Sequence, residues 1–331
     1  MYLRMMRTYG KLGRIHSAVL TGLAPVCTAA ATGRVLSLSH YIELFLIGFL
    51  FHLYLFVYNE IRDVNIDRVS KNLKTKPLID GSISLKGAQT VVLLSCFLIV
   101  AFTVIFFQNN AVVLLGVCVV AFLLGWIYDA FGKRLPHADY SLGLMIFFVA
   151  LYGGFSVNTA LTPFVFLIAL LGFSQMLIQN IIAGLKDVDH DAVAGGLSTP
   201  LRLGVWVHAD RFFISRGFIA YILLLKAVHI TLVLLPFSLH WVSYEPWQFY
   251  IAIVLIMATV VFMLRFLAMK TFQREKLMRT IGFHEMFTFM IIPLLLFSFI
   301  GPAASIFLVI FPVLWLGVFL LILYRRLMPA I

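Results

Sequence analysis

Charged side chains are scarce in this sequence, and that scarcity excludes a soluble globular domain. Only 12% of the 331 residues are Asp, Glu, Lys or Arg, whereas 62% are hydrophobic and the mean hydropathy is +1.03. Soluble domains carry about 25% charged residues. The apolar/polar alternation of a membrane β-barrel is also missing. The composition therefore indicates a membrane protein built from helices.

Cysteine is also sparse, which limits the redox and metal chemistry open to the chain. Cys27, Cys96 and Cys118 are the three cysteines, and all of them fall inside apolar runs. Their spacing matches neither a metal site nor a disulfide framework. They are interpreted as packing residues.

Ten apolar runs are long enough to cross a hydrocarbon core, which takes roughly 20 helical residues. We therefore expect an all-α fold, a polytopic transmembrane bundle of about nine to ten spans, forming one domain over residues 1–331. The basic segment before the first run resembles a signal peptide, but the run is long for a signal core, and an uncleaved helix is preferred. The runs are 15–33, 39–59, 85–107, 111–131, 139–157, 161–184, 211–237, 247–268, 283–300 and 302–324.

Lys and Arg are nearly absent from alternate loops. Arg34 is the single basic residue of the odd-numbered loops, whereas the N-terminal segment, the even loops and the C-terminal segment are rich in bases. The positive-inside rule then predicts that both termini and all even loops are cytoplasmic. The net charge of +11 is attributed to topology and to anionic lipid headgroups, and not to nucleic-acid binding.

The first acidic cluster follows the second apolar run directly, in NEIRDVNID. On a helix Asn59, Asp63 and Asp67 lie at i, i+4 and i+8, with Glu60 beside them, so four oxygen-bearing side chains share one face. This is also the C-terminal end of the helix, where the macrodipole disfavours negative charge. A cation is expected to offset the cluster.

A second cluster follows the sixth apolar run, in KDVDHD. Asp187 and Asp191 repeat the four-residue spacing, and Asp189 lies between them. The separation of Asp63 from Asp187 equals that of Asp67 from Asp191, which hints at two related halves, about 1–135 and 136–331. By the predicted topology both clusters lie at the cytoplasmic side of the membrane.

Two carboxylate pairs at one membrane depth are typical of a site for a hard divalent cation. Mg²⁺ takes one or two carboxylates and completes its shell with water and phosphate oxygens. Bases interspersed among the acids favour a diphosphate ligand over a bare ion. The alternative is that the acids are ordinary juxtamembrane residues paired with neighbouring bases, and the matched spacing, side and depth weigh against it. The interspersed bases are Arg62, Arg68, Lys76, Lys186 and Arg202.

These motifs resemble the UbiA superfamily of intramembrane prenyltransferases. Its first signature, Asn-Asp-x-x-Asp-x-x-x-Asp, is matched by residues 59–67, and its basic-Pro pair with a Gly-Ser turn by residues 76–82. The second signature is matched by Asp187, Asp191 and the Thr-Pro-x-Arg-Leu-Gly run at 199–204. A Tyr followed by Lys-Arg is matched at 128–134. The resemblance covers about residues 15–210.

The sequence departs from that family's pattern at three points. Glu60 replaces the usual Asp, and Gly184 stands where some members have a further acid. Members commonly have nine core spans, so the tenth run is an addition or a miscount. These departures bear on the metal geometry more than on the class.

The resemblance implies a role for each matched residue, with Mg²⁺ as the cofactor. Asp63, Asp67, Asp187 and Asp191 are the expected catalytic carboxylates. The implied metal ligands are these four together with Asn59 and Glu60, and Asp189 is a further candidate. The implied diphosphate-binding residues are Asn59, Arg62, Arg68, Lys76, Tyr128, Lys133 and Lys186.

The resemblance further implies transfer of a prenyl group from a polyprenyl diphosphate to an aromatic, quinone-precursor or lipid-alcohol acceptor. A terpene cyclase and a polyprenyl-phosphate pentosyltransferase of the same fold remain open. A secondary transporter is the alternative from another class, and the mid-span Lys226 is the residue that meets its expectation. His52 is expected to be a satisfied interhelical histidine rather than a ligand contact. Acceptor, prenyl chain length and oligomeric state stay undetermined.

Overall fold

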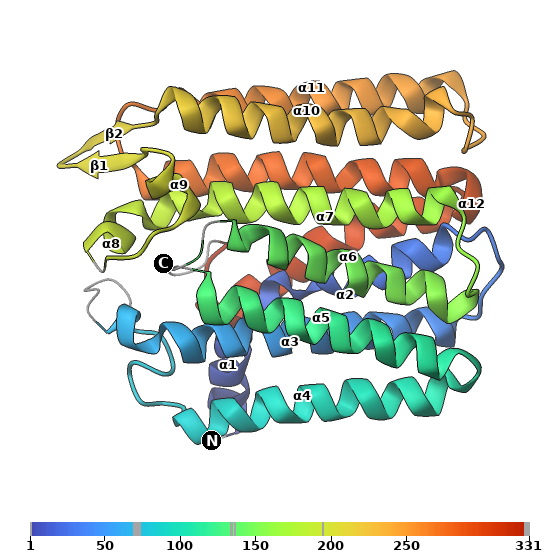
Figure 1. Ribbon diagram of the computed structural model, residues 1–331, viewed down its shortest axis with the longest axis horizontal. Coiled ribbons are helices and arrows are strands. Elements are labelled where there is room, and N and C mark those ends of the chain that lie inside the picture. Colours follow the sequence, from blue (N-terminus) through green and yellow to red (C-terminus); the bar gives the residue numbers. More distant parts are fainter. Residues whose placement is uncertain (1, 69–73, 133–134, 136, 194, 328–331) are drawn as a thin grey trace.

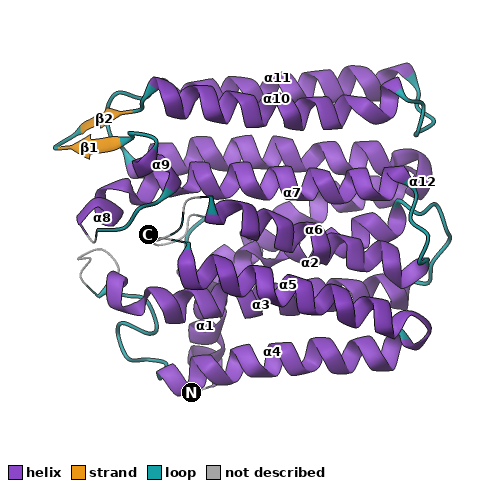
Figure 2. Ribbon diagram, viewed as in Figure 1, coloured by secondary structure: helices purple, strands orange, loops and turns teal. Residues whose placement is uncertain are grey.

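A computed structural model describes residues 2–68, 74–132, 135, 137–193 and 195–327 as a bundle of long helices (Figure 1). α10 and α11 lie along one side of the bundle and α4 along the opposite side. The all-α prediction is confirmed, apart from one small hairpin (Figure 2). The long helices are α2 (Ala18–Ala30), α3 (Leu38–Asp67), α4 (Leu85–Phe106), α5 (Ala111–Phe131), α6 (Ala138–Val157), α7 (Pro163–Ala183), α10 (Arg216–Ser238), α11 (Pro246–Leu267) and α12 (Arg274–Tyr324).

Shorter elements connect the long helices or precede them, and most of them gather at one end of the bundle. The amphipathic helix α1 crosses near the N-terminus at a steep angle to α4 (Figure 1). The short elements are α1 (Tyr2–Leu12), the 3₁₀ turns η1 (Ile15–Ser17), η3 (Gln108–Asn110) and η4 (Gly184–Asp187), the helices α8 (Val188–Val193) and α9 (Thr199–Arg202), and the strands β1 (Trp206–His208) and β2 (Arg211–Phe213).

Each predicted apolar run coincides with a helical segment. Eight helices of the described chain are long and apolar enough to cross a membrane, and the segment Ile15–Ala30 is apolar but shorter. The 51 residues of α12 are not one straight helix, because Arg274 near its start and Leu323 near its end both lie at the same end of the bundle, so the chain turns back between them (Figure 1). The helix is broken at Gly301, where φ is 74° and ψ is 175°, just before Pro302. The number of spans and their orientation stay predictions.

The seventh run was predicted to begin at residue 211, and this boundary is wrong. Residues 211–213 form β2, which pairs antiparallel with β1, and Arg211 also bridges to Thr271. Helix α10 begins only after Ser215, whose hydroxyl accepts a hydrogen bond from the backbone N–H of Phe218. A short strand pair placed against an apolar run gives too weak a pattern to be separated from it.

The backbone of α2 lies very close to the neighbouring helices, because glycines occupy the contact positions. At Gly48 of α3 an added Cβ would collide with the Thr21 carbonyl of α2, and at Gly153 of α6 it would collide with Pro25. The Thr28 hydroxyl donates to the carbonyl oxygen of Ala150 across the second contact. Small residues at helix crossings allow such close backbone approach in membrane bundles. α2 therefore lies at the centre of the bundle.

One end of the bundle, called the acidic end below, brings together the end of α3, the helix α8 and the hairpin (Figure 1). The first and last described helices also meet there. The guanidinium Nε of Arg7 donates to the carbonyl of Leu323 at 2.6 Å, and the indole of Trp315 donates to the carbonyl of Ile15 at 2.7 Å. The segment around Arg7–Ile15 is thus joined to the segment around Trp315–Leu323 at the acidic end.

Candidate active site

The acidic face of α3 carries the cation that the sequence predicted. Lys76 returns from the following loop, and its Nζ lies 2.7 Å from Asp67 Oδ2 and 3.0 Å from Glu60 Oε2. Both carboxylates are buried, Glu60 at 5% exposure and Asp67 at 6%. Asn59 is engaged separately and donates to Asp129 Oδ1 at 3.1 Å. Lys76 therefore offsets the negative charge at the C-terminal end of α3.

Arg14 is the second cation of this face, a role that no local pattern around residue 14 indicates. Its Nη2 lies 2.5 Å from Glu60 Oε1, and its guanidinium lies over the Phe56 ring. Burial lowers the pKa of Arg14, but the attraction of Glu60 outweighs it, so the pKa is raised. Asp63 and Asp187 also act on Arg14 electrostatically. This guanidinium thus links the two acidic motifs.

The backbone at Arg14 is strained, which is common at functional sites. Its φ is 45° and ψ is 42°, in the left-handed region that non-glycine residues rarely adopt. Its carbonyl oxygen accepts from the backbone N–H of Ser17 at 2.9 Å and lies 3.3 Å from Nε2 of His52. His52 Nδ1 also lies 3.3 Å from the hydroxyl of Thr21. His52 is therefore a satisfied interhelical histidine, as expected, and it supports the Arg14 turn.

The three carboxylates of the second acidic motif differ in their contacts and exposure. Asp189 is held by Arg274 of α12 at 2.8 Å. Asp191 is buried at 5% exposure. Asp187 is the most accessible of the three, with 41% of its side chain exposed and Lys186 Nζ 4.0 Å away. Asp187 is thus the carboxylate of this motif that is most open to a ligand.

A hydrogen-bonded chain joins four further elements beneath the motifs. Tyr128 of α5 donates to Asn180 Oδ1 of α7 at 2.9 Å, and Asn180 in turn donates to Asp139 of α6. Thr199 of α9 donates to the other oxygen of Asp139. Asp63 acts electrostatically on Tyr128. Tyr128 is therefore held beside the first motif, and it is not an isolated interfacial anchor.

Sequence reasoning missed two acids here, the buried Asp129 and the partly buried Asp139. Asp129 is 8% exposed, and its Oδ2 has no hydrogen-bond partner among the described residues. A carboxylate at the end of an apolar run was the available signal for both residues, because burying a charge without a partner is costly.

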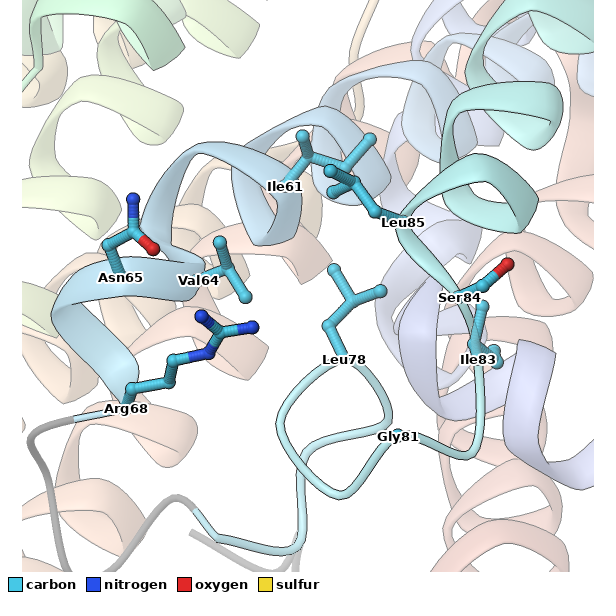
Figure 3. Close-up of a pocket in the computed structure, with 9 residues that line it drawn as sticks. All are labelled: Ile61, Val64, Asn65, Arg68, Leu78, Gly81, Ile83, Ser84 and Leu85. Carbon is cyan, nitrogen blue, oxygen red and sulfur yellow. The ribbon is translucent and has the colours of Figure 1, made fainter.

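The predicted bases separate into three groups. Lys76 and Lys186 lie beside the acids, as expected. Arg62 is exposed on α3, and Arg68 lies on another side of it, with Val64 and Leu78 (Figure 3). Lys133 lies outside the described residues. The diphosphate-binding role of all five stays a prediction, and the placement favours Lys76 and Lys186.

Within the described parts of the chain, no three His, Cys, Asp or Glu side chains are arranged to share one metal ion. Glu60 and Asp67 are engaged with Lys76 instead. The donor set still suits Mg²⁺, which prefers hard oxygen ligands and needs only one or two carboxylates when phosphate oxygens and water complete its shell. Asp63 and Asp187, which both act on Arg14, are the pair that fits this requirement best.

A small cavity of about 50 Å³ lies inside the bundle between α2, α6, α7 and α12. Its wall is apolar except for Thr21, Gln175 and Gln179. Gln179 and Asn180 are adjacent on α7, so the cavity lies next to the Tyr128 hydrogen-bonded chain. The cavity thus lies one residue along α7 from Asn180, which is hydrogen-bonded to Tyr128.

A bundle of apolar helices with two acidic motifs at one end is the architecture of an intramembrane enzyme. Residues 18–291 match the UbiA prenyltransferase family. The chain belongs to this family. The resemblance stated from the motifs is therefore confirmed over most of the chain.

Individual relatives are more distant. The 4-hydroxybenzoate octaprenyltransferase of Blochmanniella pennsylvanica (strain BPEN) is 26% identical over 159 residues, which are 48% of this chain and 52% of that protein. The match thus spans about half the length of this curated relative.

The fold is shared with solved structures. The apo UbiA homolog from Aeropyrum pernix K1 has a TM-score of 0.63 at 19% identity, over 92% of this chain and 98% of that one. The UbiA homolog from Archaeoglobus fulgidus bound to GPP and Mg²⁺ has a TM-score of 0.61 at 19% identity, over 86% and 99%.

Proposed function

We propose that the protein transfers a prenyl group from a prenyl diphosphate to a lipophilic acceptor within the membrane, with Mg²⁺. The observation that carries the proposal is the convergence of both acidic motifs on Arg14, beside Lys76 and Lys186. Clustered cations among carboxylates suit a metal-bound diphosphate. Family membership and a fold neighbour that binds GPP and Mg²⁺ support the same conclusion.

The proposed roles follow from exposure and partners. Asp63 and Asp187 hold the metal, with Asn59, Asp67 and Asp191 completing or supporting the set. Lys76, Lys186 and Arg14 bind diphosphate oxygens, and Tyr128 orients the group. When bound, Mg²⁺ neutralises the charge that develops on the departing diphosphate. Lys and Arg stabilise the same charge as the carbon–oxygen bond breaks, and the surrounding apolar bundle keeps water away from the carbocation.

We propose an aromatic acceptor, because the curated relative is named for 4-hydroxybenzoate. Gln175 and Gln179 would offer amide groups to a phenol or carboxylate, and the cavity that they line, about 50 Å³ in this structure, would have to widen to admit the ring. We further propose that the acidic end faces the cytoplasm, as the distribution of Lys and Arg predicts.

Diphosphate release by the purified protein in nanodiscs tests the reaction. Release from geranyl or longer diphosphates is expected only with Mg²⁺ and an acceptor, and Asp63→Asn and Asp187→Asn are expected to abolish it. Asp210→Asn, in the exposed hairpin turn, is the matched control and should retain activity. Product mass separates transferase from cyclase. Metal-independent release, or full activity in both Asn variants, would reject the proposed site.

A further inference from the structure

A cavity lies between the end of α3 and the loop that leads to α4 (Figure 3). It has a volume of about 470 Å³ and is called the loop pocket here. On α3 its residues recur at i, i+3, i+4 and i+7, roughly 150° around the helix from the Asn59–Asp67 face. The lining residues are Ile61, Val64, Asn65, Arg68, Leu78, Gly81, Ile83, Ser84 and Leu85.

The loop pocket combines an apolar floor with one cation. Leu78 and Ile83 belong to a buried apolar cluster that also contains Leu12 of α1 and Val57 of α3. The guanidinium of Arg68 points inward, toward Val64 and Leu78 (Figure 3). None of the nine lining residues is acidic, and the nearest carboxylate in the loop, Asp80, accepts from the backbone N–H of Ser82. The pocket is therefore amphiphilic and positively charged.

Its depth matches the headgroup region of a bilayer. The candidate span of α3 ends at Asn65, and α4 begins at Leu85, so the pocket lies where both helices leave the hydrocarbon. The exposed Lys74 and Lys86 lie close by in the sequence. Bases at this level attract anionic headgroups, and a volume of several hundred Å³ suits an amphiphile.

We propose that the loop pocket binds an anionic glycerophospholipid. The phosphate pairs with Arg68, and the upper part of an acyl chain covers Ile61, Val64 and Leu85. The substrate diphosphate is assigned to the other face of α3, where the acids and Lys76 lie.

Occupation of the pocket would brace the loop that carries Lys76. The backbone N–H groups of Ile79 and Asp80 both donate to the Lys76 carbonyl at 2.9 Å. The N–H of Ile83 donates to the Pro77 carbonyl at 3.1 Å, so the loop is tied together as one unit. One side of this unit delivers Lys76 to Asp67, and the other side forms the pocket wall. This consequence rests on the proposed role of Lys76, whereas lipid binding itself does not.

Native mass spectrometry of the purified full chain in detergent, without Mg²⁺ or substrate, measures the binding. We expect one phosphatidylglycerol to be retained in preference to phosphatidylcholine. Arg68→Glu should weaken retention about thirty-fold, because the variant reverses one charge at the headgroup. Arg279→Glu, at another exposed site, is the matched control. Val64→Trp fills the pocket without changing charge and should also weaken retention, whereas Val112→Trp, 86% exposed on α5, should not.

Hydrogen exchange of residues 74–84 tests the bracing. Phosphatidylglycerol should slow exchange there in the parent protein and not in Val64→Trp. Equal retention of both lipids, or unchanged retention in both pocket variants, would overturn the proposal. Displacement of the lipid by geranylgeranyl diphosphate or by inorganic phosphate would also overturn it, since the pocket would then be a site for a substrate or a free anion. These outcomes are independent of turnover, so they separate failure of this proposal from failure of the proposed reaction.

Discussion

The ammonium of Lys76 lies 2.7 Å from the carboxylate of Asp67, and the same ammonium contacts Glu60. One cation thus holds two buried carboxylates of the first acidic motif. Part of this motif is neutralised by the protein itself, and Asp63 is its more exposed carboxylate.

Lys76→Met is expected to remove the cation that the described residues supply to Asp67, and one of the two that they supply to Glu60. Loss of a charged hydrogen bond to a buried group costs about 2 kcal/mol, so the thermal midpoint in detergent should fall. Diphosphate release should also fall sharply. Adding Glu60→Gln should restore part of the stability and none of the activity. A double variant that recovers turnover would show that Lys76 acts only by neutralising the motif.

Arg14→Lys is expected to retain folding but to raise the KM for the prenyl diphosphate. Lys keeps the charge but lacks the planar fork that reaches Glu60 while remaining close to Asp63 and Asp187. Steady-state kinetics at several diphosphate concentrations measure the effect. Arg279→Lys is the control, and equal kinetics in both variants would remove Arg14 from the site.

Asp139→Asn is expected to lower activity through Tyr128. The variant amide cannot accept at both positions, so the bond from Asn180 or the bond from Thr199 is lost. One unmet buried group costs about 1–3 kcal/mol, and Tyr128 loses its fixed partner. Activity and thermal midpoint should fall together, whereas Tyr128→Phe should reduce activity with a smaller loss of stability. Full activity in Asp139→Asn would contradict this chain of contacts.

Lys226 is expected to be coupled to Glu285. Lys226 is 2% exposed on α10, and the carboxylate that acts on it is Glu285 of α12. Neighbouring His229 lies 2.8 Å from the Ser174 hydroxyl, and His284 lies 3.0 Å from Glu285. Lys226 Nζ and Glu285 Oε2 have no hydrogen-bond partner among the described residues, so the two charges interact across a gap. Removing one of them should cost less than the roughly 3–5 kcal/mol of a contacting buried pair, and replacing both should be less harmful still. In a double-variant cycle, Lys226→Met with Glu285→Met should be more stable than either single variant, and additive losses would refute the pairing.

Gly301→Ala is expected to destabilise α12 at its break. The backbone there combines φ 74° with ψ 175°, a region that is essentially limited to glycine and costs other residues about 1–3 kcal/mol. No atom lies within 4 Å of an added Cβ, so the cost is conformational and not steric. Gly282→Ala, also in open space but in regular helix, is the control and should be neutral or stabilising. Equal thermal midpoints would show that the break tolerates a side chain.

The helices and the positions of the two acidic motifs could be predicted from the sequence, because apolar run length and four-residue spacing are local patterns, whereas the roles of these acids stay predictions. It predicted a cation for the first motif without identifying the residues. The role of Arg14 was not predicted because its contact with Glu60 joins segments far apart in the chain, and no local spacing indicates such a contact. The role of Asp139 was not predicted for the same reason, since its partners Asn180 and Thr199 belong to other helices. The proposed internal repeat stays a prediction.

The family match ends at residue 291, yet the support of the Arg14 turn extends beyond it. Trp315 binds the carbonyl of Ile15, the residue after Arg14, and the backbone of Leu323 receives Arg7. The part of α12 after Gly301 therefore supports the acidic end as a buttress, in addition to any role as a membrane anchor. Truncation before Trp315 should disable an enzyme whose recognisable motifs are all intact, and a C-terminal fusion should be joined through a flexible linker that leaves this buttress in place.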